Sequence, residues 1–185
     1  MALTPTLKSM EDLFGKLERE AHRAWRADEE IGVEQAISQA DHFYNFCVTA
    51  HAMKDYFFES IKIVEDADKQ SYREKWNKDK ILLAATEIAN ASKHFILRDR
   101  KTRDPKEVKT NNVEPTTREA EVFQLTVSDE KIAFQEKSAI QPDLIIELEN
   151  GEKWGLWNFK AHIIDYWAKC LIALNPEWIP GHEAK

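Results

Sequence analysis

The chain has 185 residues, of which 43% are hydrophobic and 32% are charged, and its formal net charge is −7. This length suits one domain, and this composition suits a folded chain with a sizeable core. The net negative charge argues against a protein that coats duplex DNA over its whole surface. None of the five glycines forms a GxGxxG turn or a GxxxxGK[ST] phosphate loop, which excludes Rossmann and P-loop nucleotide binding.

Two amphipathic helices are predicted in the first third of the chain. From Ser9 to about Ala27, apolar residues recur at steps of three and four, which is the spacing of one helix face. A second pattern of about 30 residues begins near Gly32 and extends to Ile61. We expect this second helix to be the central helix of the fold.

A third helix and a charged connector follow. After a polar break at residues 65–71, the apolar spacing predicts a helix from about Tyr72 to Leu97. The segment 99–118 then mixes basic residues with prolines and polar residues, and residues 98–109 contain six basic against three acidic side chains. This local positive charge contrasts with the acidic remainder of the chain, and Arg100, Lys101 and Arg103 are its candidate nucleic-acid contacts.

The last third of the chain predicts two β-hairpins and a final helix. Apolar and polar residues alternate from Phe123 to Phe134 around a turn at residues 128–130. Residues 144–148 and 154–157 flank Asn150-Gly151, a pair that tolerates the positive φ angles of a type I′ hairpin turn. Helical spacing returns from residue 158 to residue 174 and ends before two prolines.

These elements predict a mainly α fold, a four-helix bundle with two β-hairpins forming a small antiparallel sheet inserted before the last helix. We expect one domain over residues 1–185, made of three helices (9–98), the charged connector (99–118), the hairpin insertion (119–157), the final helix (158–175) and a tail (176–185). Cys47 and Cys170 lie in apolar helical patterns without CxxC spacing, which favours buried thiols in a reducing compartment. No secretory signal or membrane span is evident, so a cytoplasmic location is expected.

Two groups of polar residues are candidate sites. His51 and Asp55 are four residues apart at the edge of the apolar stripe of the second helix. They provide two metal ligands where a site needs three or four, so a polar pair at a helix seam is the simpler interpretation, and no metal or other cofactor is expected. Asn90, His94 and Arg98, with Glu87, share one face of the third helix. They form either a phosphate-handling group or an ordinary solvated face.

The run Ala89-Asn90-Ala91-Ser92-Lys93-His94-Phe95, late in the third predicted helix, resembles the HEPN superfamily. The resemblance implies a helical bundle, often dimeric, of a kind that acts in toxin–antitoxin or phage-defence systems, often as a metal-independent ribonuclease. The family motif is an arginine, frequently followed by a polar residue, with a histidine after four to six intervening positions. Asn90 matches the polar position and His94 the histidine, whereas Ala89 stands where the motif has arginine. Arg98, one turn beyond His94, is the candidate substitute.

Three functions remain open on the sequence alone. The leading interpretation is a cytoplasmic HEPN-like protein that binds RNA or a partner protein and has weak or no catalysis. The enzyme alternative is a divergent ribonuclease with His94 as acid and base and with Asn90 and Arg98 as phosphate contacts. The third is a purely structural interaction module. Six tryptophans and nine phenylalanines are a large aromatic load for one small core, so we also expect a homodimer.

Overall fold

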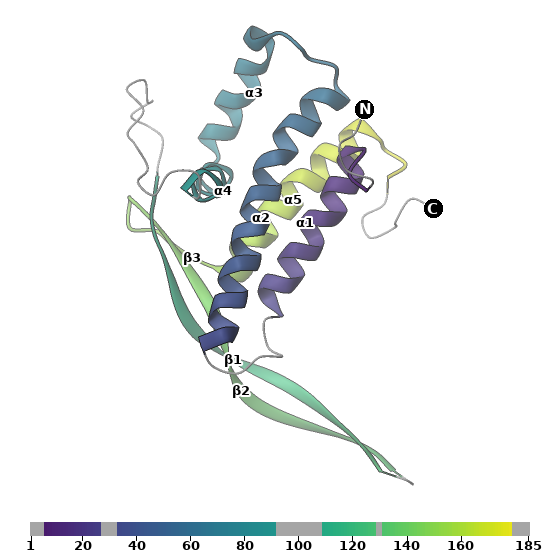
Figure 1. Cartoon of the computed structure of the whole chain (residues 1–185), viewed down its shortest axis with the longest axis vertical. Coiled ribbons are helices and arrows are strands. Elements are labelled where there is room, and N and C mark those ends of the chain that lie inside the picture. The colour runs from purple at the N-terminus through teal and green to yellow at the C-terminus, as the bar shows by residue number, and fades with distance from the viewer. Residues whose placement is uncertain (1–5, 27–32, 92–108, 129–130, 179–185) are drawn as a thin grey trace.

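The computed structural model describes residues 6–26, 33–91, 109–128 and 131–178 (Figure 1). In chain order the elements are α1 (Met10–Trp25), α2 (Val33–Ser60), α3 (Asp66–Lys78), α4 (Lys80–Ala91), β1 (Thr110–Ser128), β2 (Lys131–Leu148), β3 (Lys153–Gly155) and α5 (Leu156–Leu174). The strands form one antiparallel sheet in the order β1-β2-β3. The predicted class, mainly helical with a small antiparallel sheet before the last helix, is therefore confirmed.

Helices α1, α2 and α5 run side by side in the body of the molecule (Figure 1). Helix α1 begins at a capping box, in which the Ser9 hydroxyl accepts from the Asp12 amide and the Asp12 carboxylate accepts from the Ser9 amide, both at 3.1 Å. One continuous core joins the apolar faces of the helices to the buried side of β2. The last helix thus returns to complete the bundle, as its apolar spacing predicts.

Much of the aromatic content lies inside this core. Trp76 and Trp167 are fully buried with ring centroids 5.7 Å apart, and Phe57 lies within 6.4 Å of both rings. Such edge and tilted ring contacts add to the stabilisation that apolar burial provides. Of the six tryptophans, Trp157 alone is exposed, at 52%. The aromatic load therefore gives weaker support to a dimer interface than the sequence suggests, and the homodimer stays a prediction.

The prediction of a single third helix over residues 72–97 is wrong. Helix α3 begins earlier, at Asp66, and stops at Lys78, and α4 starts at Lys80 in a different direction (Figure 1). Asp79 causes the break because its extended backbone leaves the helix and its Oδ1 accepts from the amides of Ile81 and Leu82 at 3.0 and 3.1 Å. This is the geometry of a helix N-cap.

The charged connector also ends earlier than predicted. Residues 110–118, assigned to the connector from sequence, are the first half of β1 and pair with residues 141–148 of β2. Pro115 is compatible with this strand because β1 lies at the edge of the sheet, where a missing amide costs no ladder bond. The predicted first hairpin is present, with Ser128 opposite Lys131, and its two strands extend beyond the helices as a twisted ribbon (Figure 1).

The second predicted hairpin is present as β2 and β3, but its turn is not type I′. Gly151 has φ of +80° while Asn150 is not at positive φ, and the Gly151 amide donates to the Leu148 carbonyl at 2.8 Å. These features define a three-residue loop with a glycine bulge, a common alternative to the two-residue turn. The two hairpins share β2, and Trp157 belongs to α5 and not to a strand.

The two cysteines differ in their burial. Cys47 is fully buried and burial raises the pKa of its thiol, whereas Cys170 is only half-buried, so the expectation of two buried thiols holds for Cys47 alone. Both thiols are free. Among the described residues, no helix has the length and apolar character needed to cross a bilayer.

Candidate functional site

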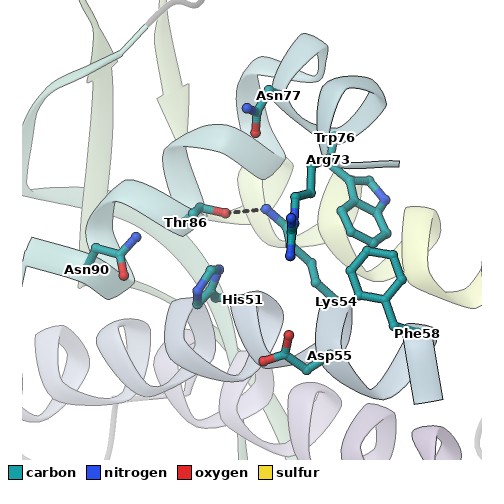
Figure 2. Close-up of a pocket in the computed structure, with 9 residues that line it drawn as sticks. All are labelled: His51, Lys54, Asp55, Phe58, Arg73, Trp76, Asn77, Thr86 and Asn90. Atoms are coloured by element: carbon teal, nitrogen blue, oxygen red, sulfur yellow. Dashed lines mark hydrogen bonds between the residues drawn. The ribbon is translucent and has the colours of Figure 1, made fainter. Parts of the chain in front are cut away.

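A pocket of about 300 Å³ opens between α2, α3 and α4. Nine side chains line it: His51, Lys54, Asp55 and Phe58 from α2, Arg73, Trp76 and Asn77 from α3, and Thr86 and Asn90 from α4. Figure 2 shows these side chains extending from three helices toward one space. The break at Asp79 creates the site, because it turns α4 away from α3 and leaves both helices facing α2.

Lys54 is the most unusual group in the pocket. Its ammonium donates to the Thr86 hydroxyl at 2.7 Å, and that hydroxyl in turn donates to the Leu82 carbonyl at 2.9 Å (Figure 2). The ammonium also lies 5.6 Å from the centroid of the Trp76 ring. Burial lowers the pKa of Lys54 to about 8, and the neighbouring Asp55 carboxylate offsets part of that shift. The ammonium is thus charged at neutral pH but poorly solvated.

The other charged groups in the pocket are less buried. Arg73 is exposed, forms an ion pair with Asp66 at 3.2 Å, and holds its guanidinium carbon 6.0 Å from the Phe58 ring centroid. Asp55 is exposed as well. The pocket therefore contains two cations, one carboxylate and several neutral polar groups. Phe58 and Trp76 form its apolar floor. An anionic group entering it would meet Lys54 at the inner end and Arg73 at the rim.

The structure brings together site residues that the sequence presents as separate candidates. Asn90, one of the three proposed catalytic residues, lines the same pocket as His51 and Asp55. Glu87, from the same predicted face, points elsewhere, since its carboxylate accepts from the Thr110 amide at 2.7 Å and ties α4 to β1. His94, Arg98, Arg100, Lys101 and Arg103 lie outside the described residues.

Ala89 occupies the position of the motif arginine, and its surroundings explain why an arginine does not fit there. The residue is 4% exposed and belongs to the hydrophobic core, and its carbonyl accepts from the Tyr44 hydroxyl at 3.4 Å. A guanidinium at this position would be buried in apolar surroundings, which is costly without a partner. Position 89 therefore faces the core, while Asn90 beside it faces the pocket.

Sequence reasoning missed Lys54, although a signal was present. Lys54 is the one lysine or arginine of α2, and it falls among Ala50, Met53, Phe57 and Phe58 in the apolar stripe. A lone basic residue on the buried side of a helix is unusual, because lysine is rarely buried without a partner. Arg73, by contrast, had no distinguishing pattern on the polar helix α3.

The residues present suit polar and electrostatic binding better than metal chemistry. In the part of the chain that the structure describes, no group of three or more histidine, cysteine, aspartate or glutamate side chains is close enough to hold a metal ion. His51 and Asp55 thus have no third ligand of these types nearby among those residues. Besides His51, Asp55 and Thr86, the polar lining consists of an ammonium, a guanidinium and two side-chain amides, which are groups that bind phosphate or carboxylate oxygens.

Comparisons with known proteins add no relative from which a function could be carried over. No family model matches the chain, and neither a curated protein nor a solved structure is significantly similar to it.

Proposed function

We propose that this protein binds single-stranded RNA and that the pocket between α2, α3 and α4 holds one phosphate group of the strand. The observation that carries the proposal is the position of Lys54, a charged ammonium kept inside a pocket of an acidic protein. A buried charge of this kind destabilises the folded state unless it has a full set of partners. A phosphate oxygen is a suitable partner, because charge-assisted hydrogen bonds are about twice as strong as neutral ones.

The sequence around the pocket supports a strand as the ligand. Asn90 stands at the end of α4, and residues 98–109, with six basic and three acidic side chains, follow eight residues later. A strand bound at the pocket could therefore gain further phosphate contacts from Arg98, Arg100, Lys101 and Arg103. Binding of this type depends on charge and weakens steeply with salt.

The aromatic floor of the pocket argues for recognition of the backbone and not of the bases. Trp76 and Phe58 are 2% and 4% exposed, so neither offers a free face on which a base could stack. Their contribution is to exclude water around Lys54, which strengthens its interaction with an anion. We therefore propose binding with little sequence preference.

Weak or absent catalysis is part of the proposal. The buried position of Ala89 leaves the pocket without the arginine that, in the HEPN motif, would stabilise charge on the phosphate during cleavage. We also propose that the protein is related to the HEPN superfamily, that it is cytoplasmic, and that it acts in a toxin–antitoxin or phage-defence system. A purely structural interaction module would bind no RNA at this pocket.

The experiment is a titration of a fluorescently labelled single-stranded RNA with the protein, followed by anisotropy. Lys54→Met is expected to weaken binding about tenfold, the effect of losing one buried charge-assisted hydrogen bond. Lys16→Met is the matched control, because Lys16 on α1 donates to the Thr49 hydroxyl at the same 2.7 Å but lies outside the pocket. Neutralising Arg100, Lys101 and Arg103 together is expected to lower the salt slope by about 2. Equal affinities of the two lysine variants would contradict the assigned site.

Ribonuclease activity at the same pocket is a second candidate, favoured by the pKa of about 8 for Lys54. A group that exchanges its proton near neutral pH suits general acid–base catalysis, and His51 lines the same pocket. In a metal-independent cleavage, the RNA 2′-hydroxyl loses its proton and attacks the phosphorus, and the 5′-oxygen leaves with a proton, giving a 2′,3′-cyclic phosphate. Products of this type from the natural protein, lost in His51→Gln and Lys54→Met, would favour this candidate. Loss in His94→Ala would assign the acid and base to His94.

A further inference from the structure

Two tryptophans and two cations form a compact cluster where α1 ends and α5 begins. Trp25 is the last residue of α1 and Trp157 lies in the first turn of α5, with ring centroids 4.9 Å apart. The guanidinium carbon of Arg118, on β1, lies 3.7 Å from the Trp25 centroid. The Lys160 ammonium lies 4.1 Å from the Trp157 centroid and 5.2 Å from the Trp25 centroid. Both cations are thus held against the same pair of rings.

Lys160 has no anionic partner in the described part of the chain. Its residue is 8% exposed, and within those residues its ammonium contacts the two indole rings but neither a carboxylate nor a hydrogen-bond acceptor. Burial and then the positive charge of Arg118 lower the pKa of Lys160. Helix side chains lean toward the amino end of their helix, and the contact with Trp157, three residues earlier, places the ammonium there.

Arg118 presents a second unsatisfied donor. Its Nη2 donates to the Gln141 side-chain oxygen at 2.5 Å, across the β1–β2 ladder. Its Nε, in contrast, is buried and has no acceptor among the described residues. A buried N–H group without an acceptor costs free energy, and it often marks the place of a ligand or an ordered water.

The amino end of α5 supplies a third source of positive potential. Helix α5 has 19 residues, its N-cap residue Gly155 provides no side-chain acceptor, and no acidic residue lies in its first turn. The first amides of a helix point outward and, with the helix dipole, attract anions. The indole of Trp157, in the same turn, is 52% exposed and offers an apolar surface beside these donors.

We propose that this cluster binds a phosphate group through Arg118, Lys160 and the first amides of α5, in a ligand whose planar apolar part rests on Trp157. A phosphate suits the site because its oxygens point in several directions and can accept from donors on different elements. Two neighbouring cations with no carboxylate beside them among the described residues favour a ligand that carries more than one negative charge. The site is separate from the pocket that Lys54 defines, and it stands independently of RNA binding.

The test is isothermal titration calorimetry of the full chain with phenyl phosphate, inorganic phosphate and phenol. Phenyl phosphate is expected to bind most tightly, inorganic phosphate more weakly, and phenol not measurably. Lys160→Met and Arg118→Gln are each expected to weaken phenyl phosphate binding at least about tenfold. Lys169→Met is the matched control, because Lys169 lies on the same helix, is exposed, and pairs with Asp165. Phenyl phosphate bound at the Lys54 pocket would give a separate binding event. Lys54→Met should remove only that event and leave the event that depends on Lys160 in place, which separates this proposal from RNA binding at the pocket.

The outcomes distinguish the sources of the phosphate and can overturn the site. Equal affinity for inorganic and phenyl phosphate, lost in Lys160→Met, would support the site and identify free phosphate as its ligand. Should Lys160→Met fail to fold, Arg118→Gln decides, because Arg118 lies on the edge strand. Asp28, Glu29 and Glu30 come shortly after Trp25 in the sequence and could compete with phosphate for the two cations. The titration is therefore repeated on a variant in which all three are neutralised. Absence of phosphate binding in both proteins, or binding that neither Lys160→Met nor Arg118→Gln weakens, would overturn the proposal.

Discussion

The ammonium of Lys54 on α2 lies 2.7 Å from the hydroxyl of Thr86 on α4, and Lys16 and Thr49 form a pair of the same length between α1 and α2. In both pairs the threonine hydroxyl donates to the carbonyl four residues earlier, at 2.9 and 2.8 Å. The pairs differ in their surroundings, since Lys54 alone lines the pocket. This difference makes the two lysines a natural test and control for every property assigned to Lys54.

The stability of the Lys54→Met variant relative to the natural protein is expected to depend on pH. The pKa of Lys54 falls from 10.5 to about 8 on folding, so the cost of burying its charge is fully present below pH 8 and disappears as the pH rises toward 10.5. Lys54→Met should therefore raise the free energy of unfolding at pH 7, by on the order of 2 kcal/mol after loss of one hydrogen bond. Urea unfolding at pH 7 and pH 10 measures this gain, which should shrink at the higher pH. A gain that is equal at both pH values would contradict the lowered pKa.

Asp79 is expected to contribute to stability as the N-cap of α4 and as a partner of His162. One carboxylate oxygen accepts from two α4 amides, and the other lies 2.8 Å from the His162 Nε2 on α5. Asp79→Ala should lower the free energy of unfolding by about 1–2 kcal/mol, and Asp79→Asn, which keeps a cap acceptor, by less. Asp68→Ala on the exposed side of α3 is the control. Equal stability of Asp79→Ala and the natural protein in urea would show that the cap does not define the break between α3 and α4.

Lys62 is expected to be replaceable by glycine with a gain in stability. It has φ of 57°, and the hydrogen bonds from the Lys62 amide to Glu59 and from the Ile63 amide to Phe58 form a Schellman motif after α2. A left-handed backbone conformation costs a non-glycine residue roughly 1–2 kcal/mol. Glycine avoids this cost but keeps only part of the gain in stability, because its unfolded chain has a higher conformational entropy. Lys62→Gly should raise the thermal midpoint, and Lys62→Ala, which removes the charge but keeps the strain, should not. The reverse order of the two variants would be incompatible with this helix end.

A homodimer is expected on the basis of aromatic content and the HEPN resemblance. Light scattering at micromolar protein concentration should then give about twice the chain mass of 21.5 kDa. A mass near 21.5 kDa for the natural protein would remove the dimer from the account.

The parts of the fold that could be predicted are those whose signals are local. The apolar spacing of α1, α2 and α5 and the alternation around residues 128–130 repeat within a few residues, and they define elements that the structure contains. The break at Asp79 was also local, an aspartate two residues before the apolar run that begins at Ile81, but it was hidden inside a longer helical pattern. Residues 110–118 gave no such signal, because their strand depends on pairing with residues 141–148 far along the chain.

The candidate site could be predicted only in pieces. His51, Asp55 and Asn90 stand out by their spacing, but no sequence pattern brings α2 and α4 together around one pocket. Lys54 could have been found as a lone basic residue in an apolar stripe, whereas Arg73 could not. The cluster around Trp25 and Lys160 was likewise invisible, since it joins α1, α5 and β1.

The most direct test of the central claim is a two-dimensional NMR titration of the isotopically labelled protein with single-stranded RNA. The side-chain amides of Asn77 and Asn90 face the pocket from α3 and α4, and those of Asn45 and Asn175 do not line it. RNA binding at the pocket should shift the first pair and the backbone amides around Lys54, and leave the second pair in place. Absence of binding, or bound RNA that moves neither Asn77 nor Asn90, would contradict the assignment of this pocket as an RNA site.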